Sequence, residues 1–190
     1  MSDNFFIQGI QHITDLEGYD HMLFLAALCA PFTFKEWKTV LLLATAFTVG
    51  HSVSLALSAL ELIHFNRDLI ELLIAITILL TALVNVFIDQ KGKISVWSYL
   101  LTTGFGIIHG MGFSGFFRMI SDDTGSFIRQ LLLFNLGVET GQIIIIVVFL
   151  GIMFLAGKMI VQHRRLSVAV SLFSAAVAAW MVYGLSLIHI

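Results

Sequence analysis

Charged residues are scarce in this 190-residue chain, where Asp, Glu, Lys and Arg together make up 12%. Soluble domains contain about 25% charged residues. One cysteine, Cys29, excludes an internal disulfide and a cysteine-rich metal site. A net charge of −2 and the lack of a basic run give no reason to expect a nucleic-acid partner. What the chain has instead is 58% hydrophobic residues and a mean hydropathy of +0.97, which indicates a membrane protein surrounded by lipid bilayer.

Long apolar segments separated by short polar breaks predict the fold class. A helix needs about 20 apolar residues to cross a bilayer. We expect helices over residues 19–30, 36–63, 67–88, 95–119, 127–158 and 166–187. The first is short, ends near Pro31 (the only proline), and follows another apolar segment at 5–13. The sequence therefore predicts an all-α, polytopic bundle of about six transmembrane helices, forming a single domain over residues 1–190.

The orientation follows from the basic residues of the loops, which are enriched on the cytoplasmic side. One side of the predicted bundle carries seven of them, namely Lys35, Lys38, Lys91, Lys93, Lys158, Arg164 and Arg165. The other side carries Arg67, Arg118 and Arg129. This bias predicts that both termini lie outside the cytoplasm.

Ionisable groups inside the predicted spans are the most informative residues. His51, His109 and Glu139 lie near the middle of three different spans. Such groups are costly in a membrane and normally face a partner or a water-filled cavity. Since they lie at similar depths, we expect them to share one cavity that opens outward.

Three further ionisable residues extend this predicted cavity toward its mouth. Asp20 and His21 begin the first helix at its outer end, and Glu71 lies about 7 Å below the outer end of the third. The glycines around His109 (Gly104, Gly106, Gly110, Gly112 and Gly115) have two readings. They either let another helix approach closely or break the helix so that its carbonyls can bind an ion.

Imidazole and carboxylate donors without thiolates suit divalent Ni, Co, Zn or Cu. The predicted metal site comprises His12, Asp20, His21, His51, Glu71, His109 and Glu139. A carboxylate such as Asp20 or Glu139 can also orient a histidine without touching the metal ion.

Several motifs resemble the HupE/UreJ family of bacterial membrane proteins. They are His12-Ile13, the segment from Gly18 to Phe24, Thr45 to Thr48 with His51-Ser52, Glu71, His109 to Phe113, and Asn135 to Glu139. The resemblance covers about residues 5–155. It implies a nickel or cobalt permease of the bacterial inner (plasma) membrane, with His12, Asp20 and His21 contacting the metal. Seven residues separate His12 from Asp20, where the family signature has five, which indicates a divergent branch.

Three functions remain open from the sequence. The first is secondary transport of nickel or cobalt through an outward-facing site. The second is an intramembrane zinc hydrolase that uses the same cluster, with Glu139 or Asp20 as general base and Ser52 as a helper. The third is a metal-binding chaperone or sensor. Below His51 the inner half offers few polar groups, such as Thr45 and Asn85, which favours the hydrolase. The oligomeric state is open, with a homo-oligomer among the alternatives.

Overall fold

The computed structural model of the protein describes residues 4–16, 18–63, 65–88, 94–121, 127–159 and 162–188. Within these residues the secondary structure is entirely helical, which confirms the predicted fold class. The helices are α1 (Phe5–Thr14), α2 (Tyr19–Cys29), the 3-10 helix η1 (Phe34–Glu36), α3 (Trp37–Ala59), α4 (Arg67–Phe87), α5 (Val96–Ile120), α6 (Phe127–Met159) and α7 (His163–Ile188).

Five helical segments, each containing one of α3 to α7, are long and apolar enough to cross a membrane. Large apolar side chains remain exposed along them, among them Val53 on α3, Val148 on α6 and Phe173 on α7. Polar side chains such as His51 and Gln142 are fully buried. This inside-out distribution is what a bundle surrounded by lipid requires. The first predicted helix, residues 19–30, corresponds to the short helix α2, and the apolar segment before it forms the separate helix α1.

The prediction for the second span was wrong at its end, because α3 stops at Ala59 and does not continue to Ile63. Glu61 has a left-handed backbone with φ of 59°. Its N–H donates to the carbonyl of Ser58, and the N–H of Leu62 donates to that of Leu57, each at 3.0 Å. These two bonds form a Schellman motif, which terminates a helix. The motif normally uses glycine, so the apolar pattern alone did not reveal this helix end.

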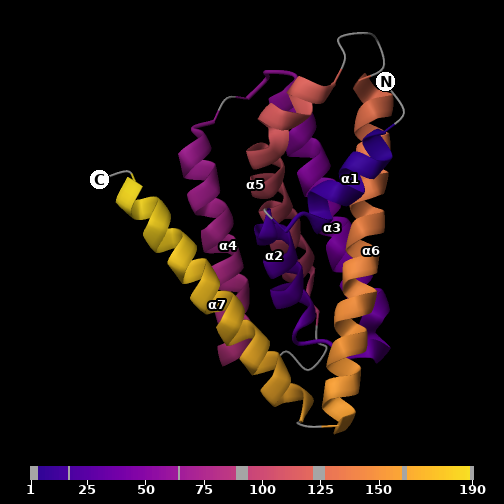
Figure 1. The fold of residues 1–190 in the computed structure, drawn as a ribbon, viewed down its shortest axis with the longest axis vertical. Coiled ribbons are helices and arrows are strands. Elements are labelled where there is room, and N and C mark those ends of the chain that lie inside the picture. The colour runs from indigo at the N-terminus through magenta and orange to yellow at the C-terminus, as the bar shows by residue number, and fades with distance from the viewer. Residues whose placement is uncertain are drawn as a thin grey trace.

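Figure 1 shows how the helices alternate between the two ends of the bundle. Helices α1, α4 and α6 begin at the upper end, and α3, α5 and α7 finish there. The start of α1 and the end of α7 therefore lie toward the same end of the bundle, as an even number of crossings requires. Two of the lysines that predict which end faces the cytoplasm, Lys91 and Lys93, lie outside the described residues.

Helices α3 and α5 form the most extensive helix contact in the bundle. A Cβ added at Gly106 would collide with the backbone of Phe47, and one at Gly110 with the backbone of His51. In the other direction, a Cβ at Gly50 would collide with the carbonyl of Thr103. Gly106 and Gly110 therefore serve close helix approach, and α5 is not broken, since it is continuous from Val96 to Ile120.

Two other pairs complete the bundle. Helix α1 packs on α6 through Gly9 and Gly137, where added Cβ atoms would meet backbone atoms of the other helix. Helix α7 packs mainly along α4 and leans away from the other helices toward its C-terminal end (Figure 1). Arg164 fixes the opposite end of this pair, because its guanidinium donates to the carbonyls of Asn85 (2.7 Å) and Val86 (2.9 Å) at the end of α4.

Candidate metal centre

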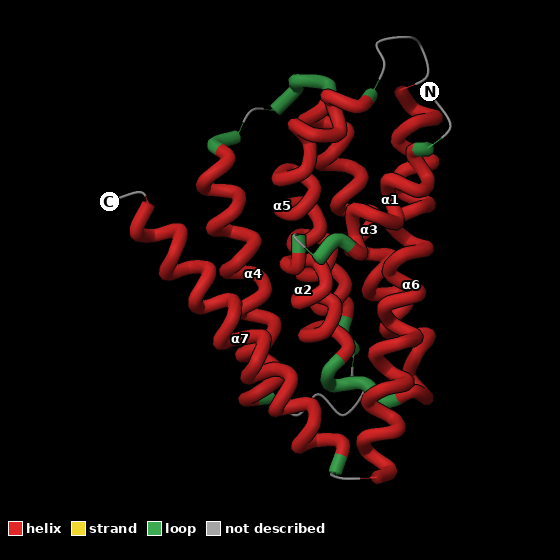
Figure 2. Tube along the Cα trace, in the orientation of Figure 1, coloured by secondary structure: helices red, strands yellow, loops and turns green. Residues whose placement is uncertain are grey.

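The first crossing is interrupted in the middle of the bundle. Helix α1 ends at Thr14 and α2 begins at Tyr19, and Figure 2 shows the connecting loop at about half the height of the long helices. Non-helical backbone at membrane depth is tolerated where it is buried in protein or lines a cavity. His12 thus lies on α1 and His21 on α2, and the ring centroids of these two histidines lie 4.6 Å apart.

Four histidines from four helices meet beside this loop. His12 comes from α1, His21 from α2, His51 from α3 and His109 from α5. The ring centroid of His51 lies 5.7 Å from that of His12 and 6.1 Å from that of His21. The ring of His109 lies 5.3 Å from that of His21. Residues up to 97 positions apart in the chain are therefore neighbours in one site.

Donor nitrogens of three of these rings are close enough to share an ion. His12, His21 and His51 each offer a ring nitrogen, and these three atoms all lie within 4.8 Å of one another. His21 and His51 are buried and His12 is half-buried. Three imidazoles form a typical set for a borderline divalent metal. His109 is not in this group of three donor residues, and its ring contact with His21 extends the cluster to α5.

The hydrogen bonds of the histidines leave the same nitrogen free in several rings. His21 Nδ1 lies 3.1 Å from Asp20 Oδ1, and His109 Nδ1 lies 2.9 Å from the carbonyl oxygen of Phe105. Nε2 of His12, His21 and His109, and both ring nitrogens of His51, are buried without a partner among the described residues. A histidine whose Nδ1–H is held by an oxygen presents Nε2 as a lone-pair donor. Buried polar atoms without a partner are costly, and a bound ion would satisfy them.

A cavity of about 570 Å³ leads to this cluster. Its walls include His12, His21 and His109, together with Asp20, Trp180 and Met181. Arg67, at the start of α4, and Leu185, near the end of α7, also line it. The lining residues therefore place the cavity mouth at the end of the bundle where α4 begins, between α4 and α7.

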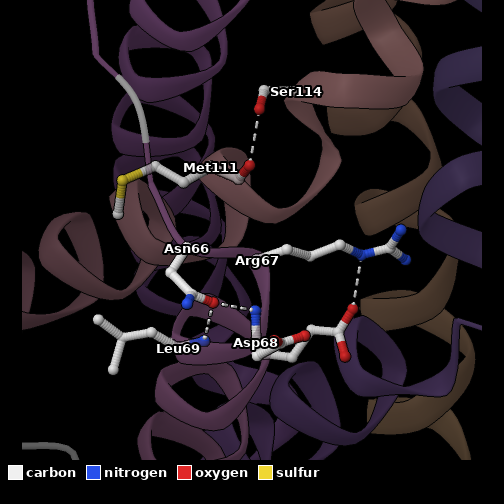
Figure 3. Close-up of polar contacts among 7 residues, drawn as sticks. Asn66, Arg67, Asp68, Leu69, Met111 and Ser114 are labelled. Atoms are coloured by element: carbon white, nitrogen blue, oxygen red, sulfur yellow. Dashed lines mark hydrogen bonds and ion pairs between the residues drawn. The ribbon is translucent and has the colours of Figure 1, made fainter.

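The start of α4 forms part of the cavity mouth and is locally well fixed (Figure 3). The side-chain oxygen of Asn66 accepts hydrogen bonds from the N–H groups of Asp68 (2.9 Å) and Leu69 (3.3 Å), which caps the helix. Arg67 Nε donates to Glu71 Oε1 at 2.8 Å. Glu71 therefore lines the cavity as part of an exposed ion pair with Arg67, one turn away on the same helix.

Glu139 has a different environment from the one expected. The group of donor atoms within 4.8 Å contains His51 but not Glu139, among the described residues. Instead, Thr45 Oγ1 of α3 donates to Glu139 Oε1 at 2.5 Å, and Thr48 Oγ1 donates to Gln142 Oε1 at 2.9 Å. The structure thus joins His12, His21, His51 and His109 with Asp20, and it places Glu71 at the mouth and Glu139 against α3.

The aromatic wall of the site was not anticipated from the sequence. The ring of Phe113 lies 3.7 Å from the ring of His12, and Phe47 lies 5.1 Å from His109, measured between centroids. These rings restrict the orientations of the imidazoles. The spacing of Phe113 four residues after His109, on one helix face, was the available signal for its position beside the cluster.

Comparison with known proteins gives one match. The model of the family described as "HupE / UreJ protein" matches residues 1–184. No curated protein and no solved structure matches the chain.

Proposed function

Because the chain belongs to the HupE/UreJ family, a family associated with nickel and cobalt transport, we propose that it is a secondary transporter of one of these ions. In this proposal the ion enters the cavity beside α7 and binds first to Nε2 of His12 and His21 and to a ring nitrogen of His51. Asp20 holds the ring of His21 in place, and His109 completes or receives the ion.

The observation that carries this proposal is the set of buried imidazole nitrogens that lack a partner among the described residues. Four helices contribute them, and no pairing of the side chains with one another uses them. A structural core histidine normally has its polar atoms satisfied. The interrupted α1–α2 crossing supports transport, since broken helices at mid-membrane commonly form the substrate sites of secondary transporters.

We further propose that the chain lies in the bacterial inner membrane with its cavity open to the outside. The cavity mouth lies at the end of the bundle that holds Arg67 and Arg118. The opposite end holds Lys35, Lys38 and Arg164. This unequal distribution of basic residues supports an external mouth under the positive-inside rule.

Uptake into proteoliposomes that contain a metal-sensitive dye tests the transport function. We expect Ni²⁺ or Co²⁺ to enter with the wild-type chain, and His51→Ala to abolish both binding and uptake. His163→Ala is the matched control, because His163 begins α7 at the opposite end of the bundle and its loss should leave both unchanged. A wild-type chain that binds the metal tightly but passes none would refute the transporter.

One observation favours a second function, intramembrane hydrolysis with zinc. A volume of about 570 Å³ is in the range of small-molecule sites, about 300–1,000 Å³, and far exceeds the size of an ion. Three histidines would hold the zinc, which supplies an activated water when it is bound, and Asp20 would be the nearest carboxylate. Zinc-dependent cleavage of an ester or amide by the purified chain, lost in His51→Ala, would establish this alternative.

A further inference from the structure

The polar contacts between α3 and α6 suggest a role beyond the histidine cluster. Thr45 and Thr48 of α3 donate to Glu139 and Gln142 of α6. Gln142 is fully buried and Thr48 nearly so. We call this set of four side chains the α3–α6 seam. It lies on the other side of α3 from the close contact with α5.

The seam begins directly beside the cluster. Thr48 precedes His51 by three residues, which is slightly less than one turn of α3, or about 4.5 Å along its axis. Thr48 lies farther from the cavity mouth than His51 does. Nε2 of Gln142 is buried without a partner among the described residues, as are both ring nitrogens of His51. Unsatisfied polar groups thus continue from the cluster into the seam.

The contact between α3 and α6 at this seam is looser than the contacts within the pairs α3–α5 and α1–α6. Helix α3 interlocks with α5 through the backbone contacts of Gly50, Gly106 and Gly110, and α6 interlocks with α1 through Gly9 and Gly137. The contact between α3 and α6 is much less extensive than either. Relative movement of the two pairs would open the α3–α6 seam while leaving both glycine contacts intact.

An apolar pocket lies further along the same two helices. Its volume is about 200 Å³, and Phe34, Trp37 and Leu41 line it from one side while Ile146 and Leu150 line it from α6. It lies toward the end of the bundle opposite the cavity mouth. The cavity, the cluster, the seam and this pocket therefore follow one another from end to end.

We propose that the α3–α6 seam is the exit path of the transported ion and that Glu139 is the next group to bind the ion after His51. This inference rests on the proposed transport function. A carboxylate with hydroxyl and amide oxygens holds Ni²⁺ or Co²⁺ less tightly than a set of imidazoles does. Binding that is weaker at Glu139 than at the cluster allows the ion to leave. In the state described here, the hydrogen bond from Thr45 occupies Glu139 and the seam is closed.

The experiment compares binding and passage of Ni²⁺ in the same variants. Glu139→Gln keeps the size of the side chain and removes its charge. We expect it to bind Ni²⁺ in detergent as the wild type does, but to lower uptake into proteoliposomes by at least about tenfold, the scale on which the loss of a supporting group acts. Thr140→Val is the matched control. Among the described residues its exposed hydroxyl donates to the carbonyl of Leu136 in its own helix, so neither quantity should change.

The possible results distinguish a failure of the exit path from a failure of the transport function. If Glu139→Gln passes Ni²⁺ at the wild-type rate, the exit path is refuted and transport stands. If it loses binding as His51→Ala does, Glu139 belongs to the first site and the inference is again refuted. If the wild type itself binds Ni²⁺ and passes none, the proposed function fails and the exit path fails with it. Thr45→Val provides an independent variant, because removing the bond that closes the seam should increase uptake without changing binding.

Discussion

The glycine contacts between α3 and α5 allow a stringent test of the bundle, because two glycines of α5 only two residues apart have opposite surroundings. A Cβ at Gly106 would collide with the carbonyl oxygen, carbonyl carbon and Cα of Phe47. Nothing lies within 4 Å of a Cβ built at Gly104. The substitutions Gly106→Ala and Gly104→Ala are chemically identical, so any difference between them reports the helix contact.

The magnitudes follow from these surroundings. In Gly104→Ala the new methyl group enters open space, and the higher helix propensity of alanine stabilises the helix by about 0.5–1 kcal/mol. In Gly106→Ala the colliding atoms are backbone, so no side-chain rotation relieves the contact and the two helices must separate. Overpacking of this kind costs about 1–3 kcal/mol. Both variants gain the helix propensity of alanine, so we expect them to differ in unfolding free energy by the overpacking cost alone, about 1–3 kcal/mol.

The purified variants are heated in detergent, and the loss of the monodisperse peak with temperature compares their stabilities. The same samples report on the site, since separation of α3 from α5 also displaces His51 from His109. Gly106→Ala should therefore bind Ni²⁺ more weakly than Gly104→Ala. Equal stability of the two variants would refute the close approach of α3 and α5, and with it the position of His51 in the cluster.

Three further predictions concern the site and the α4–α7 pair. Asp20→Asn should weaken metal binding by about 10–100-fold with little change in melting temperature, because Asp20 orients His21; isothermal titration measures both affinities. Acidifying the medium from neutral should weaken binding of Ni²⁺, because protons compete for the imidazole nitrogens; affinities measured across a pH series check the sign. Arg164→Ala should lower stability by about 1–3 kcal/mol, because the carbonyls of Asn85 and Val86 lose their donor; the exposed Arg165→Ala is the control in a thermal melt.

The sequence was sufficient for the fold class because the helices of a membrane bundle are determined by the length and hydropathy of each segment. Helices α4, α5 and α6 begin and end within one residue of their predicted limits. The end of α3 was missed because Glu61 takes a left-handed conformation that favours glycine. The start of α7 was placed three residues late because His163 and Arg164 look like loop residues until the contact of Arg164 with α4 is known.

The candidate site was only partly accessible from the sequence, because depth in the membrane does not determine which way a side chain faces. His51 and Glu139 were expected to share a cavity because they lie at the same depth. The side chain of His51 instead faces the other histidines, while Glu139 of α6 contacts Thr45 on another side of α3. The packing of the neighbouring helices determines these directions. The pairing of Arg67 with Glu71 was readable, since residues four apart on a helix surface interact. Close helix approach and a broken helix both predict a glycine-rich α5, so the contacts with Phe47 and His51 were needed to distinguish these two interpretations.

The distribution of the histidines over the helix pairs connects binding to movement. His51 and His109 belong to the interlocked pair α3–α5, whereas His12 belongs to the pair α1–α6. An ion held by His12 and His51 together therefore joins the two pairs across the α3–α6 seam and stabilises the closed arrangement by its binding free energy. Opening the seam must break at least one of these bonds. Under the proposed exit path, Glu139 replaces the ligand that is lost, because it lies on the same helix pair as His12. Without such a ligand, tighter binding at the histidines would slow passage of the ion.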